Sequence, residues 1–190
     1  MVVIGIVAIV VGVGAYNITR SRRRVSLERA TEQLASRVQK AQALAAVAGS
    51  RLGPVRDPQP GRGQRLAYGA NCTADPTLQL WVRFLPGQRV EIPAELVYDD
   101  ATDVLTVNCE IFDLTAVTSG LGTIGLPAPG AVFGFSPAGR LIVPAGAPAP
   151  IFVQLVGTTD NHTYGFRVLP SGIVCRASTV GGALCDQETG

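Results

Sequence analysis

The hydrophobic pattern divides the chain into a helical first quarter and a β-type remainder. Residues 1–16 form an apolar run without a charged side chain, and a run of this kind predicts a buried or membrane-embedded helix. From Leu27 to Ala48, apolar residues recur at steps of three and four, which is the spacing of one helix face. The expected stripe consists of Leu27, Ala30, Leu34, Val38, Ala41, Leu44 or Ala45, and Ala48. Since no proline interrupts this region, we expect one continuous helix that ends near Gly49.

After the helix, short apolar or alternating runs are separated by turns rich in glycine and proline, which is typical of antiparallel strands. The expected strands are Leu66–Ala70, Leu78–Leu85, Val90–Tyr98, Val104–Phe112, Ala131–Phe135, Arg140–Val143, Ile151–Gly157, Tyr164–Leu169 and Ile173–Ala177. The Gly-, Thr- and Pro-rich stretch Ala116–Gly130 is expected to be a long exposed loop. The pattern therefore predicts an α+β chain: a long N-terminal helix, membrane-embedded in its first part, followed by an antiparallel β-sandwich-like head.

Three segments follow from this pattern: a transmembrane helix segment at 1–19, its amphipathic continuation at 20–49, and a β-rich head at 50–190. The apolar run is shorter than the roughly 20 residues that a membrane-spanning helix needs. No basic segment precedes it and no Ala-x-Ala site follows it, so a secretory signal peptide is not favoured. The run is either a span that lacks its first residues, which we favour, or a helix at the membrane edge. Residues expected to make helix-core packing contacts are Val3, Ile6, Val10, Val13, Leu27, Leu34, Val38 and Ala41.

Charge adds little to this picture except at one place. The net charge is +2, which is too small to indicate a nucleic-acid partner. Four basic residues directly follow the apolar run: Arg20, Arg22, Arg23 and Arg24. They are interpreted as a solvated collar at the membrane interface, with lipid headgroups or nucleic acid as alternative partners.

The four cysteines form no CxxC pair and are accompanied by one histidine, so the sequence does not predict a zinc site. An even number of cysteines in a membrane-tethered chain favours two disulfides in an oxidising compartment. On proximity alone we expect Cys72 to pair with Cys109 and Cys175 with Cys185. Four reduced, buried thiols remain the alternative.

Other polar residues suggest no catalytic chemistry. Asp99, Asp100 and Asp103 are interpreted as a surface turn, with a calcium site as the alternative. His162 falls at an expected hairpin tip, and no nucleophile is indicated near it. We find no phosphate-binding loop, metal motif or paired catalytic carboxylates, and we expect neither enzymatic activity nor a cofactor.

Two regions of the chain resemble one protein family. The apolar string Val2–Val10 (VVIGIVAIV) and the helical segment Leu34–Ala45 are similar to type II secretion pseudopilins and minor type IV pilins. Val132–Arg140 (VFGFSPAGR) and Tyr164–Val174 (YGFRVLPSGIV) resemble the two late hairpins of the GspH/FimT subgroup. The helix is typical of the pilin class, and the hairpins indicate the subgroup.

The resemblance implies a non-enzymatic structural subunit of a type II secretion pseudopilus or a type IV pilus, acting in fibre assembly or priming. It implies other pilin or pseudopilin subunits as partners. It also implies a single-pass position in the bacterial inner membrane with the head in the periplasm, and later incorporation into a fibre.

In the family, a basic leader is removed by a prepilin peptidase, and a cleavage glycine and a glutamate mark the site. Both residues are absent here. The glutamate would lie two residues upstream of Met1, so we expect the natural start to lie further upstream.

Two alternatives stay open. Some members of the subgroup bind DNA through a glycine–arginine–x–arginine loop near the C-terminus. In the corresponding segment Gly172–Arg176 only the glycine and Arg176 match, so nucleic-acid binding is not favoured and Arg176 is the one candidate DNA contact. The other alternative is a membrane-anchored binding domain that never polymerises.

Overall fold

The computed structural model describes residues 2–52, 65–69, 71–73, 80–118, 122–126, 130–144, 149–157 and 163–178. Within these ranges, side-chain burial is described for most residues, but not for residues 2–13 and 50–52 of the helix, nor for residues 65–66, 122–126 and 177–178. The expected packing positions Val3, Ile6, Val10 and Val13 therefore lie outside the side chains that the structure describes.

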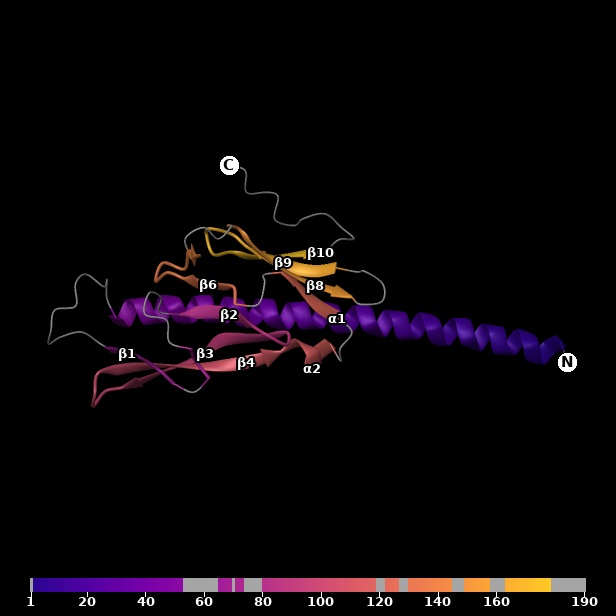
Figure 1. Cartoon of the computed structure of the whole chain (residues 1–190), viewed down its shortest axis with the longest axis horizontal. Helices are drawn as coiled ribbons and strands as arrows, with labels where there is room; N and C mark the ends of the chain where they lie inside the picture. The colour runs from indigo at the N-terminus through magenta and orange to yellow at the C-terminus, as the bar shows by residue number, and fades with distance from the viewer. Residues whose placement is uncertain are drawn as a thin grey trace.

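The N-terminal helix α1 runs without interruption over Val2–Leu52. A helix of this length measures about 75 Å at 1.5 Å per residue. Its C-terminal half lies along the β head, and its N-terminal part projects beyond the head (Figure 1). The helix ends three residues after the expected stop at Gly49, a difference typical of helix boundaries that lack a strong capping signal.

The apolar stripe of α1 faces the core, as the sequence predicts. Leu27, Leu34, Val38 and Ala41 are each at most 1% exposed, and Leu44 packs at the margin of the core. Thr31 on this stripe is also buried. Its hydroxyl donates a hydrogen bond of 2.9 Å to the carbonyl oxygen of Leu27, one turn earlier. This internal bond satisfies a polar group that the stripe would otherwise leave unpaired in the core.

The larger sheet has six strands in the order β1-β4-β3-β2-β6-β7. Its strands are β1 Arg65–Tyr68, β2 Trp81–Leu85, β3 Arg89–Asp99, β4 Val104–Asp113, β6 Val132–Phe135 and β7 Leu141–Ile142. β3 and β4 form its longest pair, with a register shift between Pro93 and Glu95. All neighbouring pairs are antiparallel except β1 and β4, which are parallel.

The smaller sheet has four antiparallel strands in the order β10-β9-β8-β5. Its strands are β5 Gly122–Leu126, β8 Ile151–Gly157, β9 Thr163–Val168 and β10 Val174–Ser178. A short helix, α2 (Leu114–Thr118), follows β4 and contacts both α1 and β5.

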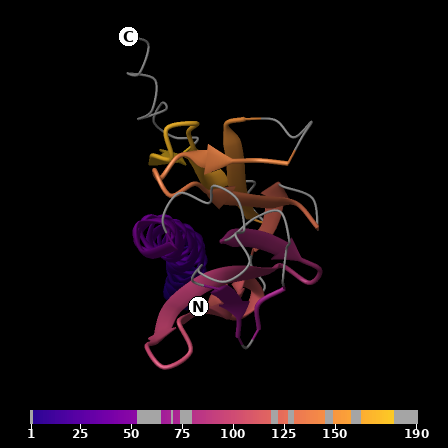
Figure 2. The ribbon, with the colours of Figure 1, turned by 90° about the vertical axis from the view of Figure 1, so that its left-hand side faces the viewer.

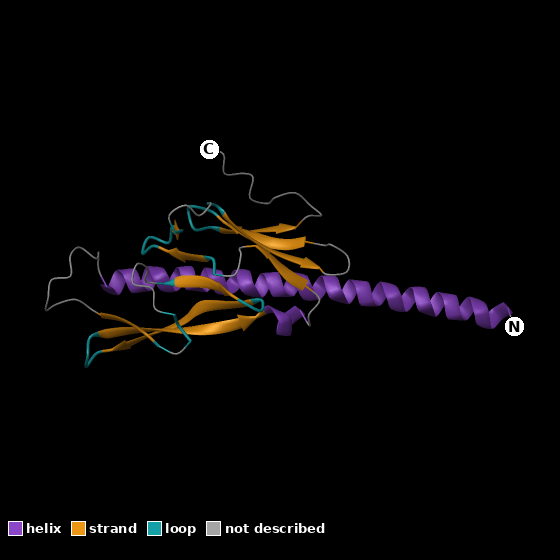
Figure 3. Cartoon of the chain, in the orientation of Figure 1, coloured by secondary structure: helices purple, strands orange, loops and turns teal. Residues whose placement is uncertain are grey.

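Both sheets pack against α1 and share one core. In the view of Figure 1, β8, β9 and β10 lie above the helix and β3 and β4 lie below it. The view along the helix shows both sheets on one side of it (Figure 2). Buried residues from α1 and from both sheets form a single hydrophobic cluster. Figure 3 shows the resulting division into one long helix and a strand-rich head.

The α+β class is confirmed, and each of the nine expected strands overlaps an observed one. Two expectations are wrong. The stretch Ala116–Gly130 is not simply a loop, because it contains the end of α2 and all of β5. The head is also not purely antiparallel, because β1 joins β4 in parallel. In both cases the pairing strand is distant in sequence. The Gly-rich β5 pairs with β8, and β1 pairs with the edge of β4 that β3 leaves free.

Within the part of the chain that the structure describes, we find no helix with both the length and the apolar character needed to cross a membrane.

The buried stripe can be tested by truncating its central residue. Leu34 is fully buried in the core, so Leu34→Ala is expected to lower the free energy of unfolding by about 2–5 kcal/mol through lost transfer energy and a cavity. Denaturant unfolding of the full chain in detergent, followed by circular dichroism, measures this change. The control is Ser36→Ala, an exposed position on the same helix, which is expected to change stability by no more than about 0.5 kcal/mol. Equal effects of the two variants would contradict the packing described here.

Candidate assembly surface of the helix and head

The helix leaves the head near Leu27, the first fully buried residue among those whose burial the structure describes. Residues 15–22 are all exposed, including Tyr16 at 67% and Ile18 at 57%. Isolated apolar side chains at a surface are common, but here they continue directly from the apolar run. The head therefore does not cover Tyr16 and Ile18 in this projecting part of α1.

A groove of about 500 Å³ lies where the helix meets α2. We call it the junction groove and define it by its lining residues, Ser21, Arg22, Val25, Ser26, Arg29, Gln33 and Val117. The Ser26 hydroxyl donates a hydrogen bond of 3.2 Å to the carbonyl oxygen of Val117. This bond fixes the α2 wall of the groove against the helix.

Arg176, the candidate DNA contact, lies on β10 and is paired with the helix. Its Nη1 donates to Glu32 Oε1 at 2.7 Å. Directly paired residues of neighbouring strands share a sheet face, and the partner of Arg176 is the buried Phe166. The side chain therefore belongs to the face that packs on α1. The register thus indicates a role in attaching β10 to the helix.

The two hairpin turns that carry the subgroup resemblance meet on the helix. Gln42 Nε2 donates a hydrogen bond of 2.8 Å to the carbonyl oxygen of Gly139 in the first turn. The Leu141 amide donates to the carbonyl oxygen of Pro170 in the second turn at 3.2 Å. A Cβ at Gly172 would overlap the Gly139 carbonyl oxygen. Close backbone packing thus requires glycine at position 172, whereas the positive φ of 76° favours glycine at position 139.

A second polar contact attaches the larger sheet to the helix. Arg37 Nε donates to Glu110 Oε1 at 2.6 Å, and its guanidinium lies 4.4 Å from the centre of the Phe112 ring. A guanidinium that combines an ion pair with ring stacking is held in one orientation. This contact fixes the position of β4 along α1.

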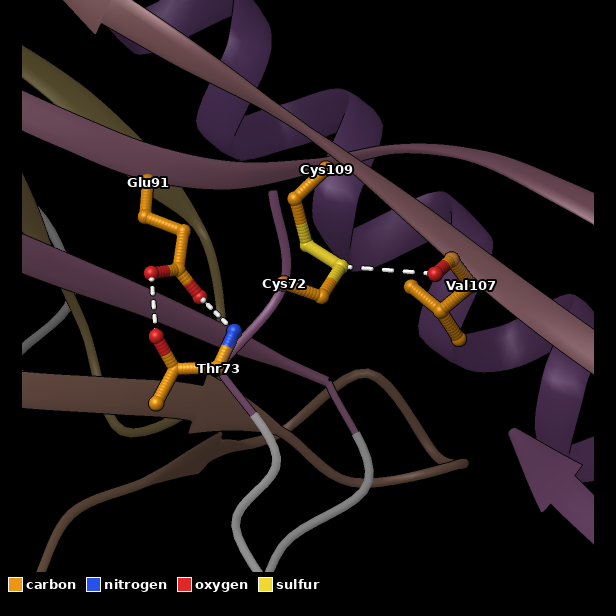
Figure 4. Close-up of a disulfide and its surroundings, with 5 residues drawn as sticks. All are labelled: Cys72, Thr73, Glu91, Val107 and Cys109. Atoms are coloured by element: carbon orange, nitrogen blue, oxygen red, sulfur yellow. Dashed lines mark hydrogen bonds between the residues drawn. A yellow bond between two sulfur atoms is a disulfide. The ribbon is translucent and has the colours of Figure 1, made fainter. Parts of the chain in front are cut away.

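The expected disulfide between Cys72 and Cys109 is present, with their Cα atoms 5.0 Å apart. It joins the segment before β2 to β4. Beside it, the buried carboxylate of Glu91 accepts hydrogen bonds from the Thr73 amide at 2.7 Å and the Thr73 hydroxyl at 2.8 Å (Figure 4). The covalent bond and the carboxylate together hold residues 71–73 against the sheet.

The second expected disulfide is not formed in the structure. Cys175 is a half-buried free thiol, and Cys185 lies outside the described residues. Cys175 is paired across the sheet with Arg167, which stacks over the ring of Phe152 at 4.5 Å.

The acidic turn uses its carboxylates locally. Asp99 accepts hydrogen bonds from the Thr102 hydroxyl at 2.7 Å and the Ala101 amide at 3.0 Å. The Thr102 bond is the main reason that the pKa of Asp99 lies below its usual value. Asp103 accepts a bond from the Tyr98 hydroxyl. These contacts agree with the surface-turn interpretation, and His162 lies outside the described residues.

Asp113 caps the short helix α2. Its Oδ1 accepts hydrogen bonds from the Thr115 hydroxyl and amide and from the Ala116 amide. The bond from the Thr115 hydroxyl is the largest cause of a lowered Asp113 pKa. Among the described residues, no group of three or more His, Cys, Asp or Glu side chains could hold a metal ion.

Sequence reasoning missed the residues that join the helix to the head. No sequence pattern distinguishes the polar residues Gln42, Arg37 and Glu110. Gln42 is 97 residues from its partner Gly139, and Arg37 is 73 residues from its partner Glu110. Glu91 carries a weak signal, because it interrupts an apolar strand. Its partner Thr73 could not be deduced from that interruption.

No protein-family model, curated protein or solved structure matches the chain.

The disulfide can be tested by replacing both of its cysteines. The double variant Cys72→Ser/Cys109→Ser releases a loop with a sequence separation of 37 residues. We expect its free energy of unfolding to fall by about 2–4 kcal/mol, measured by denaturant unfolding under non-reducing conditions. Cys175→Ser is the control and is expected to cost about 0.5 kcal/mol or less. A larger loss in the control would show that Cys175 contributes a bond of its own.

The contact between the two turns can be tested at its glycines. Gly172 and Gly130 have nearly equal positive φ angles of 91° and 92°, but no atom lies within 4 Å of a Cβ built at Gly130. Gly130→Ala therefore measures backbone strain alone, expected to cost about 1–2 kcal/mol. Gly172→Ala adds the overlap with Gly139, so we expect a clearly larger loss of stability, compared by thermal unfolding. Equal losses would show that the turns separate at little cost.

Proposed function

We propose that the chain is a minor pseudopilin or pilin subunit of the GspH/FimT kind, a structural component of a type II secretion pseudopilus or type IV pilus that acts in fibre assembly or priming. One observation carries the proposal: a single uninterrupted helix packs on a β head through its C-terminal half and projects from it through its apolar N-terminal part. A fibre subunit that is stored in the membrane needs both parts: one helix segment that holds the head, and another that can contact lipid or neighbouring subunits.

Burial separates the two tasks along the helix. The stripe from Leu27 to Ala48 is covered by the sheets, so it is not available to neighbouring subunits. The projecting part, with exposed Tyr16 and Ile18, is left for contacts outside the head. Its small residues Gly5, Gly12 and Gly14 permit helices to approach closely. Assembly through this part lets an apolar helix move from lipid into a helical core at low cost.

Polar contacts between the helix and the head support the same role. Ion pairs from Arg37 to Glu110 and from Arg176 to Glu32 join α1 to both sheets. A subunit pulled into a fibre by its helix must carry its head at a fixed angle. In this proposal the chain is single-pass in the inner membrane with its head in the periplasm, and it has no catalytic activity, cofactor or metal.

The proposal can be tested by cross-linking through the projecting helix. Cysteines introduced as Val7→Cys and Val11→Cys are expected to give a ladder of multimers in cells that carry the complete secretion or pilus machinery, with the chain expressed from its native gene. The matched control is Val97→Cys, an exposed position on the head, which should give no ladder. Cells without the assembly machinery should give none at any position.

The remaining outcomes distinguish the alternatives. A membrane-bound chain without a helix ladder would contradict polymerisation and favour an anchored binding domain. Salt-sensitive DNA binding by the full chain would favour the DNA-receptor alternative if Arg176→Ala abolished it and Arg140→Ala did not. The engagement of Arg176 with Glu32 argues against that result.

A further inference from the structure

The junction groove has a composition unlike that of a simple packing defect. Two of its seven lining residues, Arg22 and Arg29, are basic, and none of the lining residues that the structure describes is acidic. The nearby carboxylate of Glu32 is already paired with Arg176. The groove is therefore a positively charged recess with no internal counter-charge among these residues.

Helix geometry brings the two arginines to the same side. They are seven residues apart, so they differ by only about 20° around the axis and by about 10 Å along it. Both are exposed, and Arg side chains are long enough to converge on an anion placed between them. The Ser26 hydroxyl already donates its hydrogen bond to the carbonyl oxygen of Val117, so the donors left for such an anion are the two guanidinium groups.

The position along the helix selects the kind of anion. Measured from residue 19, the end of the expected membrane segment, Arg22 lies about 4.5 Å and Arg29 about 15 Å further along the helix axis. The headgroup layer on each side of a bilayer is about 5–8 Å deep. Side chains on a helix lean toward its N-terminus, which here is the direction of the apolar run. Arg29 therefore leans toward Arg22 and toward the headgroups of a membrane that holds residues 1–19, so an anion held by both side chains would lie at the outer edge of that layer.

The floor of the groove suits the rest of a lipid headgroup. Val25 is 40% exposed and lies between the arginines in sequence, and Val117 of α2 also lines the groove. Apolar surface beside two guanidinium groups fits the glycerol carbons that adjoin a phosphodiester. Inorganic phosphate has no such carbons, so with phosphate bound the apolar surface of the groove would contact water instead.

We propose that the junction groove binds the phosphate of an anionic phospholipid headgroup, with Arg22 and Arg29 as its ligands. The inference rests on the membrane position of residues 1–19 in the proposed function. A lipid held there fixes the depth and rotation of the helix in the bilayer, and hence the orientation of the head above it.

The test measures headgroup binding to the full chain in detergent micelles. Native mass spectrometry follows one-to-one adducts with dioctanoylphosphatidylglycerol, with dioctanoylphosphatidylcholine as the zwitterionic comparison. The wild type is expected to retain the anionic lipid preferentially. Arg22→Gln and Arg29→Gln should each weaken its apparent affinity about fivefold, and Arg22→Lys should restore most of it. Circular dichroism verifies that each variant is folded.

The matched control is Arg20→Gln. Arg20 belongs to the same basic collar and lies nearer the apolar run, but it is about 160° around the helix from Arg22. A groove site requires Arg29→Gln to weaken binding more than Arg20→Gln does. General attraction to a charged surface requires the reverse order, and that result would overturn the proposal.

Two further arms separate the remaining outcomes. Displacement of the lipid by an equal concentration of inorganic phosphate would assign the site to free phosphate and overturn the lipid proposal. Flotation with pure phosphatidylcholine vesicles tests membrane insertion by itself. A chain that fails to float contradicts the membrane position in the proposed function. A chain that floats but shows no preference for the anionic lipid contradicts only the present inference.

Discussion

The structure depends on the burial of one face of α1 against both sheets. From Leu27 to Ala48 this face supplies small and branched apolar side chains that are almost completely removed from water. The two sheets have no strand in common. α1 contacts several strands of each sheet, and the short α2 also contacts β3 and β5. Without α1, each sheet would expose its inner face, and the hydrophobic cluster that unites the head would be divided.

Polar contacts around this core determine where each element sits along the helix. Hydrophobic burial alone is non-directional, so it would permit sliding. Arg37 with Glu110, Arg176 with Glu32, and Gln42 with the Gly139 carbonyl fix β4, β10 and the late hairpins at separate heights. The exposed ion pairs add little stability by themselves. Their value lies in the single orientation that they favour for the head relative to the projecting helix.

Several parts of the fold follow from local signals. The helix and its buried stripe were predictable because the spacing of Leu27, Leu34 and Val38 repeats over many turns. The nine strands were predictable because alternation and turn residues mark them. The missed elements lack such signals: β5 contains Gly122 and Gly125, and α2 depends on a cap from Asp113. The Cys72–Cys109 pairing was one of three possible connectivities, and sequence proximity favoured it without deciding it.

The amino-acid sequence by itself determined the division of the chain into an apolar helical start, an amphipathic continuation and a strand-rich head, because periodicity and composition are local properties. The tertiary structure decided which surfaces remain for function. It placed Arg176 against the helix, brought Gly139 and Gly172 together on Gln42, and opened the junction groove between residues of α1 and the distant Val117. These outcomes depend on contacts between residues far apart in the chain, and no local pattern encodes which distant residue will be the partner.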